Sequence, residues 1–266
     1  MNLIYLYCVT DKIPQLKEER DRIYFLRHKG LYAIVRKVPE DEFSEEKLQK
    51  NFNNMEWLKI KAYIHEKIIE GVMKDSSSVV PFRLATLFKN EKSLTEMLEK
   101  HSEELRRNLK DLEEMEEWGV KGYCDIERLK YLFEIEDMEI LETDKKINSS
   151  SAGKAFFLRK KREELLNEVI NKKINEVSQE CLDRLGQHCL RIRLNRLLPE
   201  EATGRKDEMI LNSAFLVKKN KVKTFIKVVE TFKTQSGNRG FCFEYTGPWP
   251  PYNFCWQNDK SQTDHG

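Results

Sequence analysis

The sequence predicts an α+β fold with two domains, each a small mixed sheet covered by helices. Three observations lead to this prediction. The chain has 266 residues, which is enough for two modest hydrophobic cores. Strand-like and helix-like segments succeed one another along it, joined both by hairpins and by helical crossovers. A small, polar and aperiodic segment at 145–153 interrupts this pattern and is typical of a linker.

In the first half, segments rich in Tyr, Ile, Val and Phe are separated by turn residues, as in β-structure. We therefore expect strands at 3–9, 22–27, 31–38, 79–82 and 118–124. A hairpin turn is expected at 28–30, and Pro81 favours either an edge position for its strand or a bulge in it. Apolar residues at every third or fourth position predict helices at 58–72 and 91–117 and a third that begins after Asp125, a plausible N-cap, and extends to Ile140.

In the second half, a long apolar stripe predicts a helix from about Lys154 to Gly186, with Gly186 as a left-handed cap. Strands are expected at 190–194, 209–217 and 241–245, and another helix at 222–232. The domains expected from this pattern are an N-terminal α+β domain at 1–124, a helix and linker at 125–150, a C-terminal α+β domain at 151–247 and a tail at 248–266.

The charge balance and the lack of long apolar runs in the sequence argue against two classes of partner, nucleic acids and membranes. Lys and Arg total 47 against 45 Asp and Glu, so the net charge is +2, which argues against a dedicated nucleic-acid-binding protein. Residues 1–150 contain 26 basic and 31 acidic side chains (−5), whereas the remainder contains 21 and 14 (+7). This polarity favours docking of one half on the other, or head-to-tail association. No uncharged apolar run approaches the roughly 18–20 residues that cross a bilayer, so no membrane partner is expected.

No catalytic, cofactor or metal site is predicted. His65 and Glu66 resemble the start of the zinc motif H-E-x-x-H, but Ile69 occupies the position of the second His. We therefore expect His65 to pack or hydrogen-bond on a helix face. Gly153 and Lys154 lack the glycine and hydroxyl positions of a phosphate-binding loop. The five histidines stand near no recognisable nucleophile motif.

Two segments are candidate interaction sites, and the acidic, largely solvated helix expected around Glu103 to Glu117 is a further candidate contact. Arg191 and Arg193 alternate with apolar residues and give the strand at 190–194 a basic face, which either contacts a phosphate or acidic partner or is simply solvated. The second candidate combines three prolines, three aromatic residues, one asparagine and one glycine. These are Gly247, Pro248, Trp249, Pro250, Pro251, Tyr252, Asn253 and Phe254.

The prolines of this second segment predict a stiff, polyproline-like arm that leaves the last strand. Trp249, Tyr252, Phe254 and Trp256 are costly to leave in water, at about 1.5–3 kcal/mol for a buried side chain of Phe size. The arm must therefore dock on its own chain, on a neighbouring subunit or on a partner. A tail clamped across the junction of the two expected domains is the structural alternative to a partner-binding arm.

The segment at 247–254 is similar to the terminal signature of the gas vesicle GvpL/GvpF family. Weaker matches occur in the same order along the chain, at 5–7, 80–88, 117–121, 153–158 and 211–217. One departure is Leu84-Ala85, where Phe-Gly is expected; this alters a tight backbone site.

The resemblance implies a minor, non-enzymatic component or accessory assembly factor of gas vesicles, the protein-walled compartments that provide buoyancy. It implies binding to the small hydrophobic shell protein, suppression of its aggregation, and contacts with other accessory proteins, in the cytoplasm and at the gas vesicle. It also implies at least one ferredoxin-like domain and a tail packed on the N-terminal domain. No cofactor is implied. The alternative class is a cytoplasmic ligand-binding regulator, since small α+β domains often bind metabolites between sheet and helix.

Overall fold

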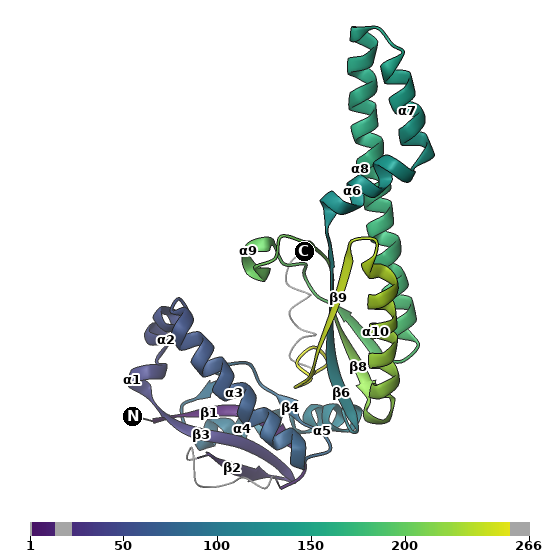
Figure 1. Ribbon diagram of the computed structural model, residues 1–266. Coiled ribbons are helices and arrows are strands. Elements are labelled where there is room, and N and C mark those ends of the chain that lie inside the picture. The colour runs from purple at the N-terminus through teal and green to yellow at the C-terminus, as the bar shows by residue number, and fades with distance from the viewer. Residues whose placement is uncertain (1, 14–22, 256–266) are drawn as a thin grey trace. The chain divides into compact units, whose positions relative to one another are not determined.

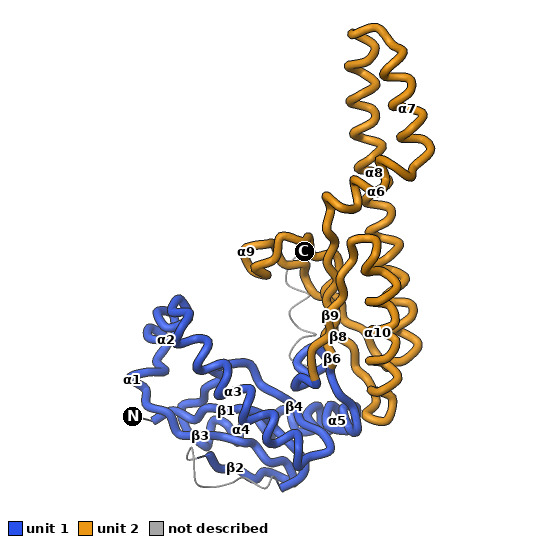
Figure 2. The backbone as a smooth tube through the Cα atoms, in the orientation of Figure 1, with its two compact units in different colours: residues 1–117, 248–266 blue, residues 118–247 orange. Residues whose placement is uncertain are grey.

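The computed structural model describes residues 2–13 and 23–255, which form two compact units (Figure 1). Figure 2 shows unit 1, made of residues 1–117 and 248–266, and unit 2, made of residues 118–247. Each unit combines a small sheet with helices, so the predicted α+β class is confirmed. Within the described ranges, no helix is both long and apolar enough to span a membrane.

The sheet of unit 1 has the order β2-β3-β1-β4, with β5 also paired to β1. Its strands are β1 (Asn2–Thr10), β2 (Ile23–His28), β3 (Leu31–Pro39), β4 (Val80–Pro81) and β5 (Leu87–Phe88). Each strand pair is antiparallel, so the prediction of a mixed sheet is wrong here. The reason is topological: β3 and β4 run in the same direction, but β1 lies between them.

The hairpin between β2 and β3 is confirmed. Lys29 and Gly30 have φ values of 46° and 80°, the left-handed pair that a two-residue hairpin turn requires. A ferredoxin-like topology has a helix between its first two strands. The corresponding connection here is 14–22, which lies outside the described residues.

The helices of unit 1 are α1 (Glu40–Phe43), α2 (Glu45–Asn51), α3 (Met55–Asp75), α4 (Glu91–Lys100) and α5 (Ser102–Asp111). The predicted stripe of α3 is buried at His65, Ile69 and Val72. The single helix expected at 91–117 is wrong, because His101 leaves helical geometry with φ −110° and ψ 13°. Beyond α5 the chain turns and enters a strand, so Glu117 lies in β-structure and not on a solvated helix.

Unit 2 is built around a sheet of order β7-β8-β6-β9. Its strands are β6 (Met115–Cys124), β7 (Arg191–Leu194), β8 (Glu208–Lys218) and β9 (Phe241–Trp249). Strand β8 is central, as predicted, and α8 and α10 cover one face of the sheet in Figure 1. Its helices are α6 (Ile126–Glu136), α7 (Met138–Asn148), α8 (Ala152–Gly186), α9 (Glu200–Thr203) and α10 (Val222–Gly237). Phe215, Phe225 and Phe243 are fully buried in the core.

The predicted linker at 145–153 is instead the turn of a helical hairpin. Its residues end α7 and begin α8 inside unit 2, and the division between the units falls at Glu117 and Trp118. Composition misleads here because the small polar residues that make a flexible linker also make a tight turn between antiparallel helices. We therefore call α7, α8 and their connecting turn the hairpin.

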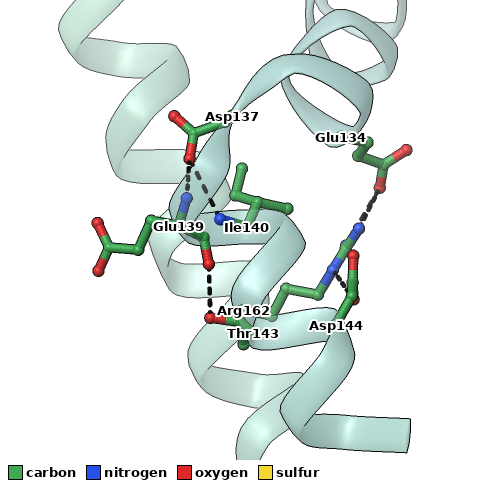
Figure 3. A network of polar contacts seen from close by, with 7 residues as sticks. All are labelled: Glu134, Asp137, Glu139, Ile140, Thr143, Asp144 and Arg162. Atoms are coloured by element: carbon green, nitrogen blue, oxygen red, sulfur yellow. Dashed lines mark hydrogen bonds and ion pairs between the residues drawn. The ribbon is translucent and has the colours of Figure 1, made fainter.

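Two helix ends also differ from expectation. Asp125 caps α6 as predicted, but the helix does not continue to Ile140, because Asp137 accepts hydrogen bonds from the N–H groups of Glu139 and Ile140 and starts α7 (Figure 3). Gly186 is the last residue of α8 and is not left-handed; the chain leaves the helix through Gln187 in right-handed geometry.

Candidate functional site: the docked C-terminal segment

The segment that carries the sequence signature follows a different path from the predicted arm. Residues 247–249 remain in β9, an edge strand in which a proline removes no donor that an inner strand would need. The expectation of a polyproline-like arm is therefore wrong for these residues. Gly247 has a φ of 138°, which side-chain-bearing residues rarely adopt.

After β9 the chain folds into tight turns. The N–H of Tyr252 donates to the carbonyl of Pro250 at 2.7 Å, and that of Phe254 to the carbonyl of Pro251 at 3.1 Å. Both prolines, Phe254 and Cys255 are buried. These residues belong to unit 1.

The four aromatic side chains expected to dock behave differently. Phe254 is buried and Tyr252 is half-buried against the core of unit 1. Trp249 keeps 39% of its surface exposed, so it is only partly docked. Trp256 lies outside the described residues. The contacts of the segment therefore centre on residues 250–255.

Glu117 is the principal polar partner of the segment. It is 4% exposed, and its carboxylate accepts the backbone N–H of Asn253 at 3.0 Å and the side-chain Nδ2–H at 2.6 Å. Burial raises the pKa of Glu117 to about 7, an effect that these two hydrogen bonds partly offset and the charge of Glu66 reinforces. The contact joins positions 136 residues apart in the sequence.

His65 lies at the centre of a second polar group. Its Nε2 is 3.0 Å from the carbonyl oxygen of Phe82, which can only accept, so Nε2 carries the hydrogen. Its Nδ1 then accepts from the hydroxyl of Tyr5 at 2.9 Å. Burial lowers the pKa of His65 to about 4, opposed by the bond to Phe82, and the ring is neutral at pH 7. The prediction that His65 packs and hydrogen-bonds is confirmed.

The hydroxyl of Tyr252 connects the segment to this group. Its oxygen lies 3.0 Å from Nε2 of His65, and it donates to Oε1 of Glu66 at 3.0 Å. Burial raises the pKa of Glu66, although the bond from Tyr252 lowers it. The other carboxylate oxygen of Glu66 is buried without a hydrogen-bond partner among the described residues. A cavity of about 260 Å³ adjoins it, lined by Ala62, His65, Glu66, Arg83, Leu84, Tyr252 and Cys255.

This arrangement holds the segment in place through hydrogen bonds to Glu117, Glu66 and His65. At pH 7 His65 is neutral. Burial raises the pKa of the Tyr5 and Tyr252 hydroxyls, so neither tyrosine is ionised to act as a nucleophile. No group of three or more His, Cys, Asp or Glu side chains in the described ranges could hold a metal ion. The geometry therefore supports a structural role for residues 250–255.

The departure noted at Leu84-Ala85 has a structural consequence. Ala85 has a φ of 60°, in the left-handed region that favours glycine. Its N–H donates to the hydroxyl of Tyr5 at 2.8 Å, which orients that hydroxyl toward His65. The chain thus carries backbone strain of about 1 kcal/mol at a position that aligns the polar group.

The other predicted site residues, Arg191 and Arg193, lie in β7 of unit 2. Strand β7 pairs with β8 in antiparallel register and, among the described strands, has no second neighbour. Three apolar side chains of this segment are exposed: Leu190, Ile192 and Leu194. The predicted alternation is thus present, but the apolar side chains are not covered.

Sequence reasoning missed Glu117 and Glu66 as partners of the segment. A signal existed for Glu117, since an acid directly before Trp118 and a run of strand-forming residues is unusual unless it has a buried partner. Glu66 gave no such signal. Charged residues occur all along α3 beside its apolar stripe, so nothing in the sequence sets Glu66 apart from them.

With this geometry in place, comparison with known proteins is informative. The sequence model of the family described as gas vesicle synthesis protein GvpL/GvpF matches residues 3–256. The chain belongs to the GvpL/GvpF family. The matched range agrees with the resemblance, whose signature at 247–254 and weaker matches from residue 5 onward lie within it.

Individual GvpL and GvpF proteins are distant relatives. Gas vesicle protein L from Streptomyces sp. (strain CB03234) is 24% identical over 229 residues, covering 86% of this chain and 81% of that protein. Gas vesicle protein L1 from Halobacterium salinarum is 22% identical over 261 residues, covering 94% and 89%. The crystal structure of GvpF from Anabaena sp. PCC7120 superposes with a TM-score of 0.73 at 17% identity, covering 96% and 98%. That of GvpF from Microcystis aeruginosa gives 0.66 at 17% identity, covering 95% and 98%. The GvpF structures thus share the fold of this chain.

Proposed function

We propose that this protein is a non-enzymatic assembly factor of gas vesicles that binds the small hydrophobic shell protein and limits its aggregation while the vesicle forms. The observation that carries the proposal is the family match over residues 3–256. Such a factor would act in the cytoplasm and at the growing vesicle, and it would also meet other gas vesicle accessory proteins.

The exposed strand β7 is consistent with a binding role. Leu190 and Leu194 are 57% and 61% exposed at the edge of a sheet, a place where another extended chain can add main-chain hydrogen bonds. Arg191 and Arg193 alternate with them. We propose β7 as one contact surface for an aggregation-prone apolar partner.

The docked segment has a supporting role in this proposal. Because residues 250–255 are held by Glu117, Glu66 and His65, they stabilise unit 1 and are not free to bind a partner. The Trp249→Ala variant tests whether Trp249 stabilises the fold or binds the shell protein. Unfolding of the variant would indicate the structural role. Loss of shell-protein binding at unchanged stability would instead assign Trp249 a direct contact.

The test is co-expression of the tagged protein with the small shell protein, read as the soluble fraction of the shell protein and as its co-purification. The proposal predicts that both rise together, and that a Leu190→Ser, Leu194→Ser variant reduces both. A matched control is Ile60→Ser, which changes an exposed apolar side chain of α3. Unchanged solubility and no co-purification with the wild-type protein would refute the proposal.

The alternative function, a ligand-binding regulator, would use the cavity lined by His65, Glu66 and Arg83. A ligand bound only by the folded protein raises its melting temperature. A thermal-shift screen with nucleotides and amino acids tests this alternative. Stabilisation by one of them, lost on Arg83→Ala, would favour it over shell-protein binding.

A further inference from the structure

The free end of the helical hairpin has an unusual composition. We define the hairpin tip as residues 145–161. It contains six basic side chains and no acidic one: Lys145, Lys146, Lys154, Arg159, Lys160 and Lys161. None of the six forms an ion pair within the described part of the chain. The tip therefore carries a concentrated positive charge without close ion pairs, although Arg159 shares a cavity with Glu134, Asp144 and Glu163.

Two aromatic side chains lie among these cations. Phe156 and Phe157 are 65% and 73% exposed, and their rings contact each other edge to face with centroids 5.9 Å apart. Each would gain about 1.5–3 kcal/mol on full burial. Their neighbours on α8 follow a different pattern, because Ala155 is buried and Leu158 is half-buried. The phenylalanines thus remain exposed beside positions of α8 that are covered.

Acidic side chains near the base of the hairpin form ion pairs with Arg162 (Figure 3). Arg162 donates from Nε to Asp144 at 2.7 Å and from both terminal nitrogens to Oε1 of Glu134 at 3.1 and 3.2 Å. Ile140 and Leu166 are buried at the same level. The base is therefore held by ion pairs and apolar packing, and the charge left over is at the tip.

The stability of the helices does not account for this composition. Lys154, in the first turn of α8, opposes the helix dipole, and that turn contains no acidic residue. Lys145 and Lys146 favour the dipole of α7. Arg159, Lys160 and Lys161 lie beyond the first turn of α8, where the effect has fallen off. Exposed phenylalanines add nothing to the core, and their position among cations is typical of a binding surface.

We propose that the hairpin tip binds a partner-protein surface that is apolar at its centre and acidic around it. The phenylalanines would enter the apolar centre, and the ring of cations would meet the acidic rim, which speeds and orients association. The choice of a protein over an anionic lipid surface rests on the proposed function, because a gas vesicle wall is made of protein. The partner is then a gas vesicle component, first of all the shell protein.

Two double variants test the tip in the co-purification assay with the shell protein. Phe156→Ser with Phe157→Ser removes the aromatic pair, and Lys160→Glu with Lys161→Glu reverses two charges. Each is expected to weaken binding by at least about tenfold. The control for charge is Lys223→Glu with Lys227→Glu, two exposed lysines of α10, and the control for aromatic removal is Tyr63→Ser. Both controls are expected to bind within about twofold of the wild type.

Salt and cross-linking provide independent readouts. Wild-type binding is expected to weaken between low and high salt, and the Lys160→Glu, Lys161→Glu variant to lose most of this dependence. A photo-reactive phenylalanine analogue at position 157 is expected to cross-link to the partner, whereas the same analogue at position 63 is not. Because all the substituted side chains are exposed, helix content and melting temperature are expected to stay unchanged.

The possible failures are distinguishable. If the wild type binds the shell protein and the tip variants bind equally well, the tip is not the docking surface and the proposed function stands. If the wild type binds no gas vesicle component, the proposed function and this inference both fail. If the wild type instead sediments with vesicles containing anionic phosphatidylglycerol, and the tip variants do not, the tip binds lipid and the protein partner is wrong.

Discussion

The contact between Glu117 and Asn253 predicts an unusual dependence of stability on pH. The pKa of Glu117 is raised from 4.5 to about 7 in the folded protein. Between these values the folded state binds more protons than the unfolded state, so this group's stabilising contribution is fully present below pH 4.5 and is lost as the pH rises through 7. From pH 5 to pH 8 the loss amounts to about 2–3 kcal/mol.

Substitution of Glu117 with Gln isolates this contribution. The variant resembles the protonated acid at every pH, and so it does not lose stability in this range. The difference in melting temperature, variant minus wild type, is therefore expected to increase between pH 5 and pH 8 by roughly 5–10 °C, at 2–4 °C per kcal/mol. The measurement is thermal unfolding at closely spaced pH values, followed by tryptophan fluorescence.

The melting temperature of the variant has to be compared with that of the wild type at each pH, because the titration of His65 changes stability with pH in the opposite direction. Its pKa is lowered from 6.5 to about 4, so its contribution is present above pH 6.5 and is lost as the pH falls. This loss occurs in both proteins and cancels in the difference. Glu113→Gln, at an exposed acid of the same segment, is the control and should give a difference independent of pH. If the difference for Glu117→Gln is equally flat, Glu117 ionises normally and is not buried beneath the segment.

Three further predictions concern stability. Tyr252→Phe is expected to cost about 1–2 kcal/mol of unfolding free energy, because half-buried Glu66 loses its donor; an unchanged urea midpoint would show that the hydroxyl is dispensable. Ala85→Gly is expected to raise stability by about 0.5–1 kcal/mol by relieving the left-handed strain, whereas Ala62→Gly inside α3 should lower it by about 1 kcal/mol; equal effects would contradict the strain. Arg162→Gln is expected to speed hydrogen exchange in α7 several-fold with α10 unchanged, and equal protection of α7 in variant and wild type would show that the ion pairs do not hold the hairpin.

Much of the fold could be predicted from local patterns. The stripe through His65, Ile69 and Val72 placed α3, and alternation placed the strands of both sheets. Two errors in the helix boundaries occurred where a single polar residue ends one helix and begins another. His101 and Asp137 do this, and neither changes the apolar periodicity on which the prediction depends.

The candidate site consists of the C-terminal segment and the residues that hold it, and only the segment was predictable from the sequence. The segment at 247–254 stood out by its prolines and aromatic side chains. Its partners did not, because Glu117 and Glu66 are 136 and 186 residues away from the groups that they bind, and no local pattern encodes such contacts. The hairpin tip was hidden for a different reason: its small polar residues resemble a linker, and the exposure of Phe156 becomes visible only in the folded chain.

The proposed function requires that this member of the GvpL/GvpF family keep the hydrophobic shell protein from aggregating. The most direct measurement dilutes denatured shell protein into buffer with increasing amounts of the purified protein and follows light scattering. The account predicts that scattering falls and reaches its minimum near a stoichiometric ratio, with the two proteins then eluting together. Scattering that is unchanged at a severalfold excess of the protein, with no shared elution, would contradict it.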